Sequence, residues 1–331
     1  MYKDMKQNTE AAGKPHENNS KSEPQAAQPA VRTLKDWIVA TRPWSFPASL
    51  MPVLVTAAWL YWYAKPQDGL TLDWWCAPLA LLMIVLMQAA GNLIGDYYDH
   101  MRGIDLPGSL NGVRHIQSGK FQPREILRFG YVCLAVACLL GVIILCRCGW
   151  QAAWLGVAAV LLVVCYPWLK AHALGDLDIL LGYSLLPSLG AAYAVTGNWM
   201  PLPMLLTLPV GSLTVAILHA NNTRDILNDS RAGIVTLCIK LGGRASQWVY
   251  ALEVALAYLL LFILCAYGLL PWFTMIAWLT LPLTMGNVRT MISAQPLAEE
   301  PIGGLDQRTA QSQLAFSLLY TLGFVVAGLL A

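Results

Sequence analysis

The stretch WWCAPLALLMIVLMQAAGNLIGDYYDHMRGID, Trp74 to Asp105, decides the fold because it joins a membrane-length apolar run to a group of acids. A helix needs about 20 apolar residues to cross the hydrocarbon core of a bilayer, and residues 74–94 supply them. Carboxylates at the mouth of a membrane span are costly and mark a functional site by default. Asp96, Asp99 and Asp105 therefore require a physical explanation.

The composition of the whole chain points to lipid as its surroundings. Of the 331 residues, 57% are hydrophobic and 12% are charged, whereas soluble domains are about 45–50% apolar and about 25% charged. The net charge of +2 is too small to indicate a nucleic-acid partner. The eight cysteines lie mostly inside apolar runs without CxxC spacing, which indicates buried side chains rather than a metal or disulfide framework. The oligomeric state stays open.

Apolar segments bounded by charged residues, Pro or Gly recur along the chain. Nine of them are candidate spans, at residues 44–64, 74–94, 127–146, 150–168, 177–197, 201–221, 247–267, 270–287 and 311–331. Backbone groups inside a bilayer have no water to bind, so they must pair within the protein. The sequence therefore predicts an all-α integral membrane protein with nine transmembrane helices.

The distribution of Lys and Arg predicts the orientation of these spans, because cytoplasmic loops carry an excess of both. With alternating spans, nineteen of the 21 Lys and Arg fall on one side, and only Lys65 and Arg147 fall on the other. The N-terminus is then cytoplasmic and the C-terminus lies outside. The two long polar loops, 95–126 and 222–246, both face the cytoplasm.

The N-terminal part of the chain differs from the rest. It is polar and rich in Gln, Asn, Glu, Lys and Pro, with no apolar core. Such a segment cannot bury enough apolar surface to fold. We therefore expect residues 1–33 to be a disordered extension and residues 34–331 to form the membrane domain.

Two clusters of amides and carboxylates end two of the predicted spans on the same side. The second lies in LHANNTRDILNDSRAGIVTL, Leu218 to Leu237, and includes Asn222. On a helix, positions three or four residues apart share one face. That relation holds for Asn92, Asp96 and Asp99 in the first cluster, and for Asn221, Asp225 and Asp229 in the second.

Carboxylates that face one cavity repel each other. Two of them about 6 Å apart cost roughly 3 kcal/mol at an effective dielectric near 20. Hard divalent cations relieve this repulsion, and Mg²⁺ commonly bridges carboxylates and substrate phosphates. The clusters therefore predict two metal positions bridged by a phosphate-bearing substrate. The basic residues that could neutralise its remaining charge are Arg102, Arg114, Lys120, Arg224, Arg231 and Lys240.

Three other interpretations compete with this one. A single DxxD at a helix end is often a solvated terminus, and each basic residue equally satisfies the orientation rule. An ion-coupled transporter also uses intramembrane acids, but it would place them near mid-span. A CDP-alcohol phosphotransferase would need a DG…AR…G…D…D signature, whereas His100 and Met101 follow Asp99.

At the level of motifs, the sequence resembles the UbiA superfamily of intramembrane prenyltransferases. ATRPWSFPASLMPVL (Ala40 to Leu54) and the two acidic segments are most similar to the MenA-type dihydroxynaphthoate polyprenyltransferases of menaquinone synthesis. The animal menaquinone-forming homologues share the NNTRD and AGIVTL runs. The resemblance extends from about Leu34 to the C-terminus.

This resemblance implies a nine-helix UbiA-type bundle with a Mg²⁺-dependent activity. The enzyme would transfer a polyprenyl group from an allylic polyprenyl diphosphate to an aromatic acceptor, dihydroxynaphthoate, whose carboxylate is lost to give demethylmenaquinone. Other acceptors within the superfamily stay open. The implied location is a bacterial inner (plasma) membrane with cytoplasmic active-site loops. Prenyl chain length is not implied.

The resemblance also assigns roles to residues of this chain. Two Mg²⁺ would bind the diphosphate through Asp96, Asp99, Asp105, Asp225 and Asp229. Gly95 stands where the family often has Asn, so Asn92 would supply that amide. The implied substrate-binding residues are Asn92, Asn221, Asn222, Arg42, Arg102, Arg114, Lys120, Arg224, Tyr97 and Tyr98.

The region after the fourth span departs from the family pattern. Tyr166-Pro-Trp-Leu-Lys170 replaces the usual glycine pair, in the part of the chain that shapes the acceptor site. Asp176 and Asp178 could orient an acceptor hydroxyl or simply begin a helix. Glu253 lies inside a predicted span, and its role is open.

Overall fold

The computed structural model describes residues 32–67, 69–103 and 115–331. Almost all of the predicted N-terminal extension, and the predicted site residues Asp105 and Arg114, lie outside this part of the chain. The described residues are helical, apart from turns and one isolated bridge between His172 and Val235. The predicted all-α architecture is confirmed.

Fourteen α-helices, four short 3₁₀ segments and one π-helical segment make up the described part. In order, they are α1 Leu34–Ala40, η1 Pro43–Ser45, α2 Pro47–Tyr63, α3 Cys76–Met101, α4 Pro123–Cys148, η2 Trp150–Ala152, α5 Ala153–Ala171, α6 Gly175–Leu180, the π-helix η3 Leu181–Leu185, α7 Leu186–Thr196, α8 Leu202–Leu206, α9 Leu208–Arg224, α10 Ile226–Arg231, α11 Leu237–Leu241, α12 Gly243–Ala266, η4 Trp272–Thr280, α13 Leu281–Ser293, η5 Glu300–Ile302 and α14 Leu305–Leu330.

Six helical runs in the described chain are long and apolar enough to cross a membrane. They are Cys76–Met101, Pro123–Cys148, Trp150–Ala171, Gly175–Thr196, Gly243–Ala266 and Glu300–Leu330. The other three predicted spans fall on α2, which has 17 residues, on α8 with α9, and on η4 with α13. Six spans are thus supported in the described part of the chain, and the nine-span topology with its orientation stays a prediction.

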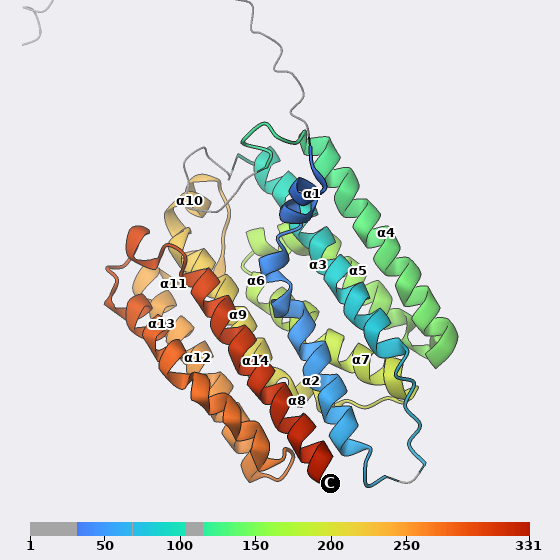
Figure 1. The fold of residues 1–331 in the computed structure, drawn as a ribbon. Helices are drawn as coiled ribbons and strands as arrows, with labels where there is room; N and C mark the ends of the chain where they lie inside the picture. The colour runs from blue at the N-terminus through green and yellow to red at the C-terminus, as the bar shows by residue number, and fades with distance from the viewer. Residues whose placement is uncertain (1–31, 68, 104–114) are drawn as a thin grey trace, which may run out of the picture. The chain divides into compact units, whose positions relative to one another are not determined.

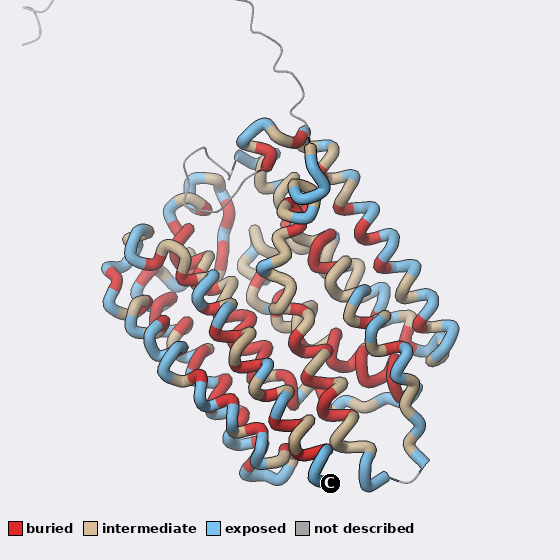
Figure 2. The backbone as a smooth tube through the Cα atoms, viewed as in Figure 1, coloured by how far each residue is buried: buried red, intermediate tan, exposed pale blue. Residues whose placement is uncertain are grey.

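The helices pack side by side in a bundle (Figure 1). Helix α14 contacts α2 and α9, and α9 contacts α12, while α3 packs against α4 and α5. The largest hydrophobic core forms between α2, α9, α12 and α14, and it includes Trp59, Tyr250, Phe316, Tyr320 and Phe324. In Figure 2 the buried residues lie on the inward faces of these helices and the exposed ones on the outward faces.

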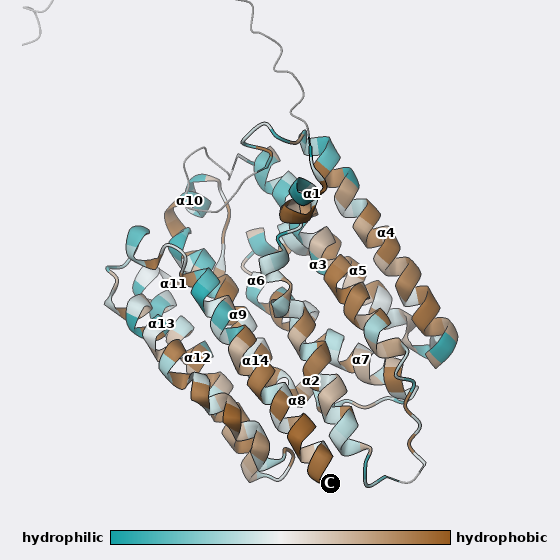
Figure 3. Cartoon of the chain, viewed as in Figure 1, coloured by the Kyte–Doolittle hydropathy of each residue, from teal (hydrophilic) through white to brown (hydrophobic). Residues whose placement is uncertain are grey.

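The outward faces are themselves apolar. Leu252 and Leu259 of α12 are 64% and 52% exposed, and Val157 and Leu161 of α5 are 60% and 56% exposed. A soluble protein rarely leaves such continuous apolar surface in water. In Figure 3 hydrophobic colour covers the long shafts, and hydrophilic colour gathers at the end that holds α1, α10 and the start of α4. These faces therefore suit contact with lipid.

Local sequence explains where two helices at that polar end begin. Thr33 and Asp36 form a capping box on α1, and Gln122 and Glu125 form another on α4. In each box the first side chain accepts a hydrogen bond from the backbone N–H three residues later, and the later side chain accepts one from the backbone N–H of the first residue. Asp36 also accepts a hydrogen bond from Lys120 Nζ at 2.5 Å, which lowers the pKa of its carboxyl well below the ordinary value.

Candidate active site

Both acidic clusters border one cavity of about 290 Å³ at the polar end of the bundle, here called the main cavity. It lies where the C-terminal parts of α3, α5 and α9 meet α10 and the N-terminal turn of α14. The charged side chains that line it are Arg42, Asp96, Asp99, Lys170, Arg224, Asp225, Asp229 and Asp306. Helix packing thus brings together two clusters that are far apart in the chain.

The first cluster is held by the segment that precedes α2. Arg42 forms an ion pair with Asp96, and its backbone has φ +58°, a left-handed conformation that non-glycine residues rarely adopt. Asn92 Nδ2 donates to Thr41 O at 2.9 Å and to Ser45 Oγ at 3.0 Å. Asn92 therefore positions the Arg42 segment over α3, and Arg42 in turn faces the first cluster.

A lysine from α5 completes the first cluster. Lys170 Nζ lies 3.6 Å from Asp99 Oδ2, and the Lys170 side chain is only 12% exposed. A lysine is rarely buried unless a charge pairs with it. In the sequence, Lys170 is the only cation of a short loop, and no motif marks it as a site residue. Its position beside Asp99 results from the packing of α5 against α3.

Arg224 organises the second cluster. Its Nε lies 2.9 Å from Asp225 Oδ1, and its Nη1 lies 3.2 Å from Asp306 Oδ1. Its Nη2 donates to Asn221 Oδ1 at 2.6 Å. One planar guanidinium thus links α9 to α14 and fixes the orientation of Asp225. Asp306 was not singled out in the sequence, because it stands alone before the last span.

Asp229 is the most deeply placed carboxylate of the second cluster. It is 2% exposed, and within the described residues its Oδ2 has no hydrogen-bond partner. Burial raises the pKa of Asp229 to about 6; Lys170 opposes the rise, and Asp225 and Asp99 add to it. A buried oxygen without a partner is costly, so this side chain is suited to bind a cation.

Charge is unbalanced in the main cavity. Among the described residues that line it, five carboxylates face three cationic side chains. The excess of negative charge, all on hard oxygen ligands, matches the requirements of Mg²⁺. The geometry can therefore hold divalent cations and, through them and the three cations, a multiply charged anion.

Several predicted site residues lie elsewhere in the described structure. Tyr97 and Tyr98 pack edge to face with ring centroids 5.2 Å apart, and neither borders the main cavity. Arg102 donates to Pro167 O at 2.9 Å, and Lys120 pairs with Asp36 outside the cavity. Asn222 is buried, 2% exposed, behind the cavity lining rather than in it.

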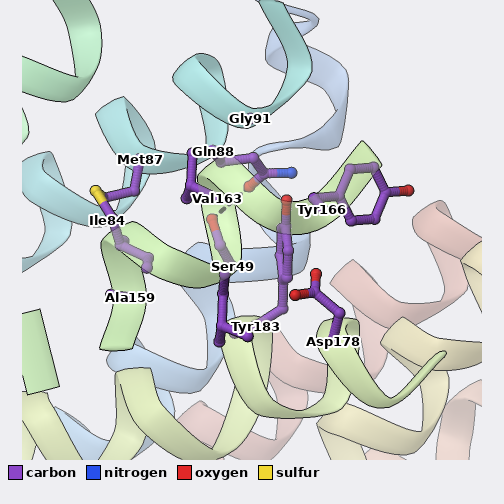
Figure 4. A pocket seen from close by; sticks show the side chains of 12 residues that line it. Ser49, Ile84, Met87, Gln88, Gly91, Ala159, Val163, Tyr166, Asp178 and Tyr183 are labelled. Atoms are coloured by element: carbon purple, nitrogen blue, oxygen red, sulfur yellow. Dashed lines mark hydrogen bonds between the residues drawn. The ribbon is translucent and has the colours of Figure 1, made fainter. Parts of the chain in front are cut away.

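A smaller pocket of about 40 Å³ adjoins the main cavity, and we call it the side pocket (Figure 4). Four residues, Gln88, Gly91, Tyr166 and Tyr183, border both spaces. The rest of the side pocket is lined by Ser49, Ile84, Met87, Ala159, Leu162, Val163, Asp178 and Gly182. Most of these side chains are apolar, so the carboxyl of Asp178 is exceptional among them.

A second buried polar group lies among α6, α9 and α12. His219 Nδ1 is 3.5 Å from Asp176 Oδ2 and 3.3 Å from Glu253 Oε1, and His219 is fully buried. Its Nε2 lies 3.1 Å from Ser246 O, which suits a donated hydrogen bond. The residues whose roles were open in the sequence, Asp176 and Glu253, thus meet at one histidine.

A helical membrane bundle whose cavity holds two opposed aspartate clusters has the architecture of an intramembrane prenyltransferase. The sequence model of the UbiA prenyltransferase family matches residues 53–298, and the chain belongs to this family. The UbiA prenyltransferase domain-containing protein 1 of Xenopus tropicalis is 33% identical over 297 residues, covering 88% of this chain and 82% of that protein. The human protein of the same name is 32% identical over 303 residues, covering 88% and 83%.

Solved structures share the fold. A UbiA homologue from Archaeoglobus fulgidus bound to GPP and Mg²⁺ aligns with a TM-score of 0.58 and 17% identity, over 88% of this chain and 99% of that chain. A structure of digeranylgeranylglyceryl phosphate synthase aligns with a TM-score of 0.57 and 18% identity, over 90% and 99%. At these identities the likeness concerns the fold alone.

These comparisons confirm the predicted UbiA membership and disfavour the ion-coupled transporter. The finer prediction, a MenA-type enzyme of a bacterial plasma membrane, stays a prediction. The two relatives named above are animal proteins, and their names specify the UbiA domain and no acceptor.

Proposed function

We propose that this protein transfers a polyprenyl group from an allylic polyprenyl diphosphate to an aromatic acceptor, with dihydroxynaphthoate as the acceptor and demethylmenaquinone as the product. The observation that carries the proposal is the meeting of two aspartate clusters with Arg42, Lys170 and Arg224 around one cavity. That arrangement suits a metal-bound diphosphate better than a transported ion, because the cations supply sites for phosphate oxygens.

Asp96, Asp99, Asp225 and Asp229 would hold two Mg²⁺ ions. Their oxygens are hard ligands, and Asp229 Oδ2, which has no hydrogen-bond partner among the described residues, fits a cation. The Archaeoglobus homologue was solved with GPP and Mg²⁺, which supports this assignment. Bound Mg²⁺ supplies charge stabilisation to a departing diphosphate.

The cationic side chains of the protein would stabilise the rest of the negative charge on the diphosphate. Arg42 and Lys170 approach from η1 and α5, and Arg224 is fixed by Asp225 and Asp306. Each can donate to diphosphate oxygens whose negative charge grows as the allylic C–O bond ionises. Because these donors are already oriented by carboxylates, little reorganisation is needed when the charge develops.

The acceptor assignment rests on sequence resemblance. The NNTRD and AGIVTL runs, Asn221 to Asp225 and Ala232 to Leu237, are similar to those of menaquinone-forming enzymes. In the structure, Asn221, Arg224 and Asp225 of the first run form one hydrogen-bonded unit at the main cavity. We further propose the predicted nine-span topology, with the main cavity opening towards the cytoplasm of a bacterial plasma membrane.

Purified protein in liposomes with Mg²⁺ and geranylgeranyl diphosphate tests the proposal. Dihydroxynaphthoate and hydroxybenzoate are offered in parallel, and products are identified by mass spectrometry. We expect a prenylated, decarboxylated naphthoate whose formation stops with EDTA and in the Asp96→Ala and Asp225→Ala variants. Prenylation of hydroxybenzoate alone would reject the naphthoate acceptor. Cation flux without any turnover of the donor would reject the enzyme.

A further inference from the structure

The side pocket contains a buried carboxyl that the proposed function leaves without a role. Asp178 lies in the first turn of α6 and is 4% exposed. Within the described residues its Oδ1 has no hydrogen-bond partner. A buried carboxyl oxygen without a hydrogen bond is unfavourable in apolar surroundings, so Asp178 is suited to a polar partner that enters the pocket.

The volume of the side pocket limits what this partner can be. A single buried water needs roughly 10–15 Å³ on this measure, and the pocket offers about 40 Å³. An aromatic ring system is too large for that space, but the hydroxyl-bearing edge of one fits. The remainder of the ring would lie in the main cavity, beyond the shared residues Gly91 and Tyr166.

The backbone that borders the side pocket includes a π-helical turn and a glycine. Tyr183 and Gly182 belong to the π-helical turn η3, Leu181–Leu185, and such turns occur frequently at functional sites. Gly91 places bare backbone beside Tyr183 Oη; a Cβ there would lie 3.8 Å from that hydroxyl, in ordinary van der Waals contact. Tyr183 and Asp178 both line the side pocket, and in the view of Figure 4 the Asp178 carboxyl lies next to the Tyr183 ring.

We infer that the side pocket is the binding site for a ring hydroxyl of the aromatic acceptor, with Asp178 accepting the hydrogen bond of that hydroxyl. The inference rests on the proposed function and adds a recognition residue to it. A carboxyl oxygen that accepts a hydrogen bond from a phenol polarises the phenol O–H bond and raises the electron density of the ring. This favours attack by a ring carbon on the allylic cation. The apolar walls from α3 and α5 contact the ring edge and keep water out.

The test compares the binding of two probes in the absence of donor. 4-Hydroxy-2-naphthoate carries a ring hydroxyl that cannot bond to its own carboxylate, and 2-naphthoate lacks the hydroxyl, so the ratio of their Kd values isolates the contribution of that hydroxyl. We expect wild-type protein in detergent to bind the hydroxylated probe about tenfold more tightly, the effect of one hydrogen bond to a buried polar group. In Asp178→Leu we expect this ratio to fall to about one. A wild-type ratio near one would overturn the inference without any variant, and would leave a buried water as the partner of Asp178.

Asp176→Asn is the matched control. It removes a carboxylate two residues away on the same helix, which faces His219 and does not line the side pocket. We expect its ratio to stay near tenfold. An equal loss of discrimination in both variants would contradict a specific contact at Asp178. Should Asp178→Leu fail to fold, as judged by gel filtration and thermal melting, Asp178→Ala replaces it. This variant also removes the accepting oxygen, and an unaltered ratio in a folded variant overturns the inference.

Turnover measurements separate this inference from the proposed function. If wild-type protein binds the hydroxylated probe in an Asp178-dependent manner but transfers no prenyl group to an aromatic acceptor, the reaction is wrong and the pocket assignment stands. If prenyl transfer occurs and Asp178→Leu leaves the acceptor KM unchanged, the pocket assignment fails and the reaction stands.

Discussion

Replacement of Lys170 by Met tests the electrostatics of the main cavity. The Nζ–Oδ2 distance of 3.6 Å between Lys170 and Asp99 corresponds to about 4–5 kcal/mol of attraction at an effective dielectric near 20. Because both side chains are largely buried, at 12% and 23% exposed, screening by water removes only part of it. If about 1.4 kcal/mol of it survives as net coupling, the substitution changes an equilibrium constant tenfold.

Lys170→Met should strengthen the interaction of the main cavity with Mg²⁺ and weaken its interaction with the diphosphate. Without the lysine, Asp99 interacts more strongly with a metal cation, so we expect the Mg²⁺ concentration for half-maximal activity to fall at least tenfold. The diphosphate loses a cationic partner, so we expect kcat to fall about 10²–10³-fold, as when one preorganised donor to a developing anion is removed.

The assay is prenyl transfer under a Mg²⁺ titration at saturating donor, with wild-type, Lys170→Met and Arg289→Met proteins. Arg289 is an exposed cation on α13 outside the cavity, and its removal should change neither quantity. A Lys170→Met enzyme that keeps its kcat, or that needs more Mg²⁺ than the wild type, would refute the reasoning.

Three further predictions concern the stability of the fold. His219→Ala removes the imidazole that lies between the carboxyls of Asp176 and Glu253. We therefore expect a loss of about 3–5 kcal/mol of stability, seen in thermal melting and partly restored by adding Glu253→Gln. The buried Asp229 has its pKa raised from 3.8 to about 6, so it binds a proton more readily in the folded state than in the unfolded state. In the presence of EDTA, the free energy of unfolding should therefore rise as pH falls from 7.5 to 5, and Asp229→Asn should flatten that dependence. A Cβ at Gly323 would lie 2.5 Å from Thr274 Cα, whereas one at Gly156 meets nothing within 4 Å; Gly323→Ala should lower the melting temperature through overpacking, and Gly156→Ala should not.

Helix geometry explains why several predicted site residues lie outside the main cavity. Asp96 and Asp99 are three residues apart on α3 and share a face, while Tyr97 and Tyr98 stand between them and are rotated away. The same spacing rule that found the carboxylates excludes the two tyrosines from the main cavity. Arg102 follows the end of α3, and its guanidinium donates to α5 instead.

Breaks within spans were also invisible in the sequence. The predicted span 177–197 contains the π-helical turn η3, and the predicted span 201–221 is interrupted between α8 and α9. Hydropathy reports only that a segment suits lipid. It does not report whether the backbone remains α-helical, because neighbouring helices satisfy freed backbone groups inside the bundle.

The sequence alone was sufficient for the membrane environment, the approximate spans, the two aspartate clusters and the resemblance to the UbiA family. The first three depend on composition and on spacing within one helix, and the resemblance rests on short sequence motifs; a linear pattern records all of these. Only the tertiary structure brought Lys170 of α5, Arg224 of α9 and Asp306 of α14 to the same cavity, and placed Asp178 of α6 beside it. These residues belong to helices that meet by side-chain packing across long chain separations, and no local spacing encodes which of their faces come together.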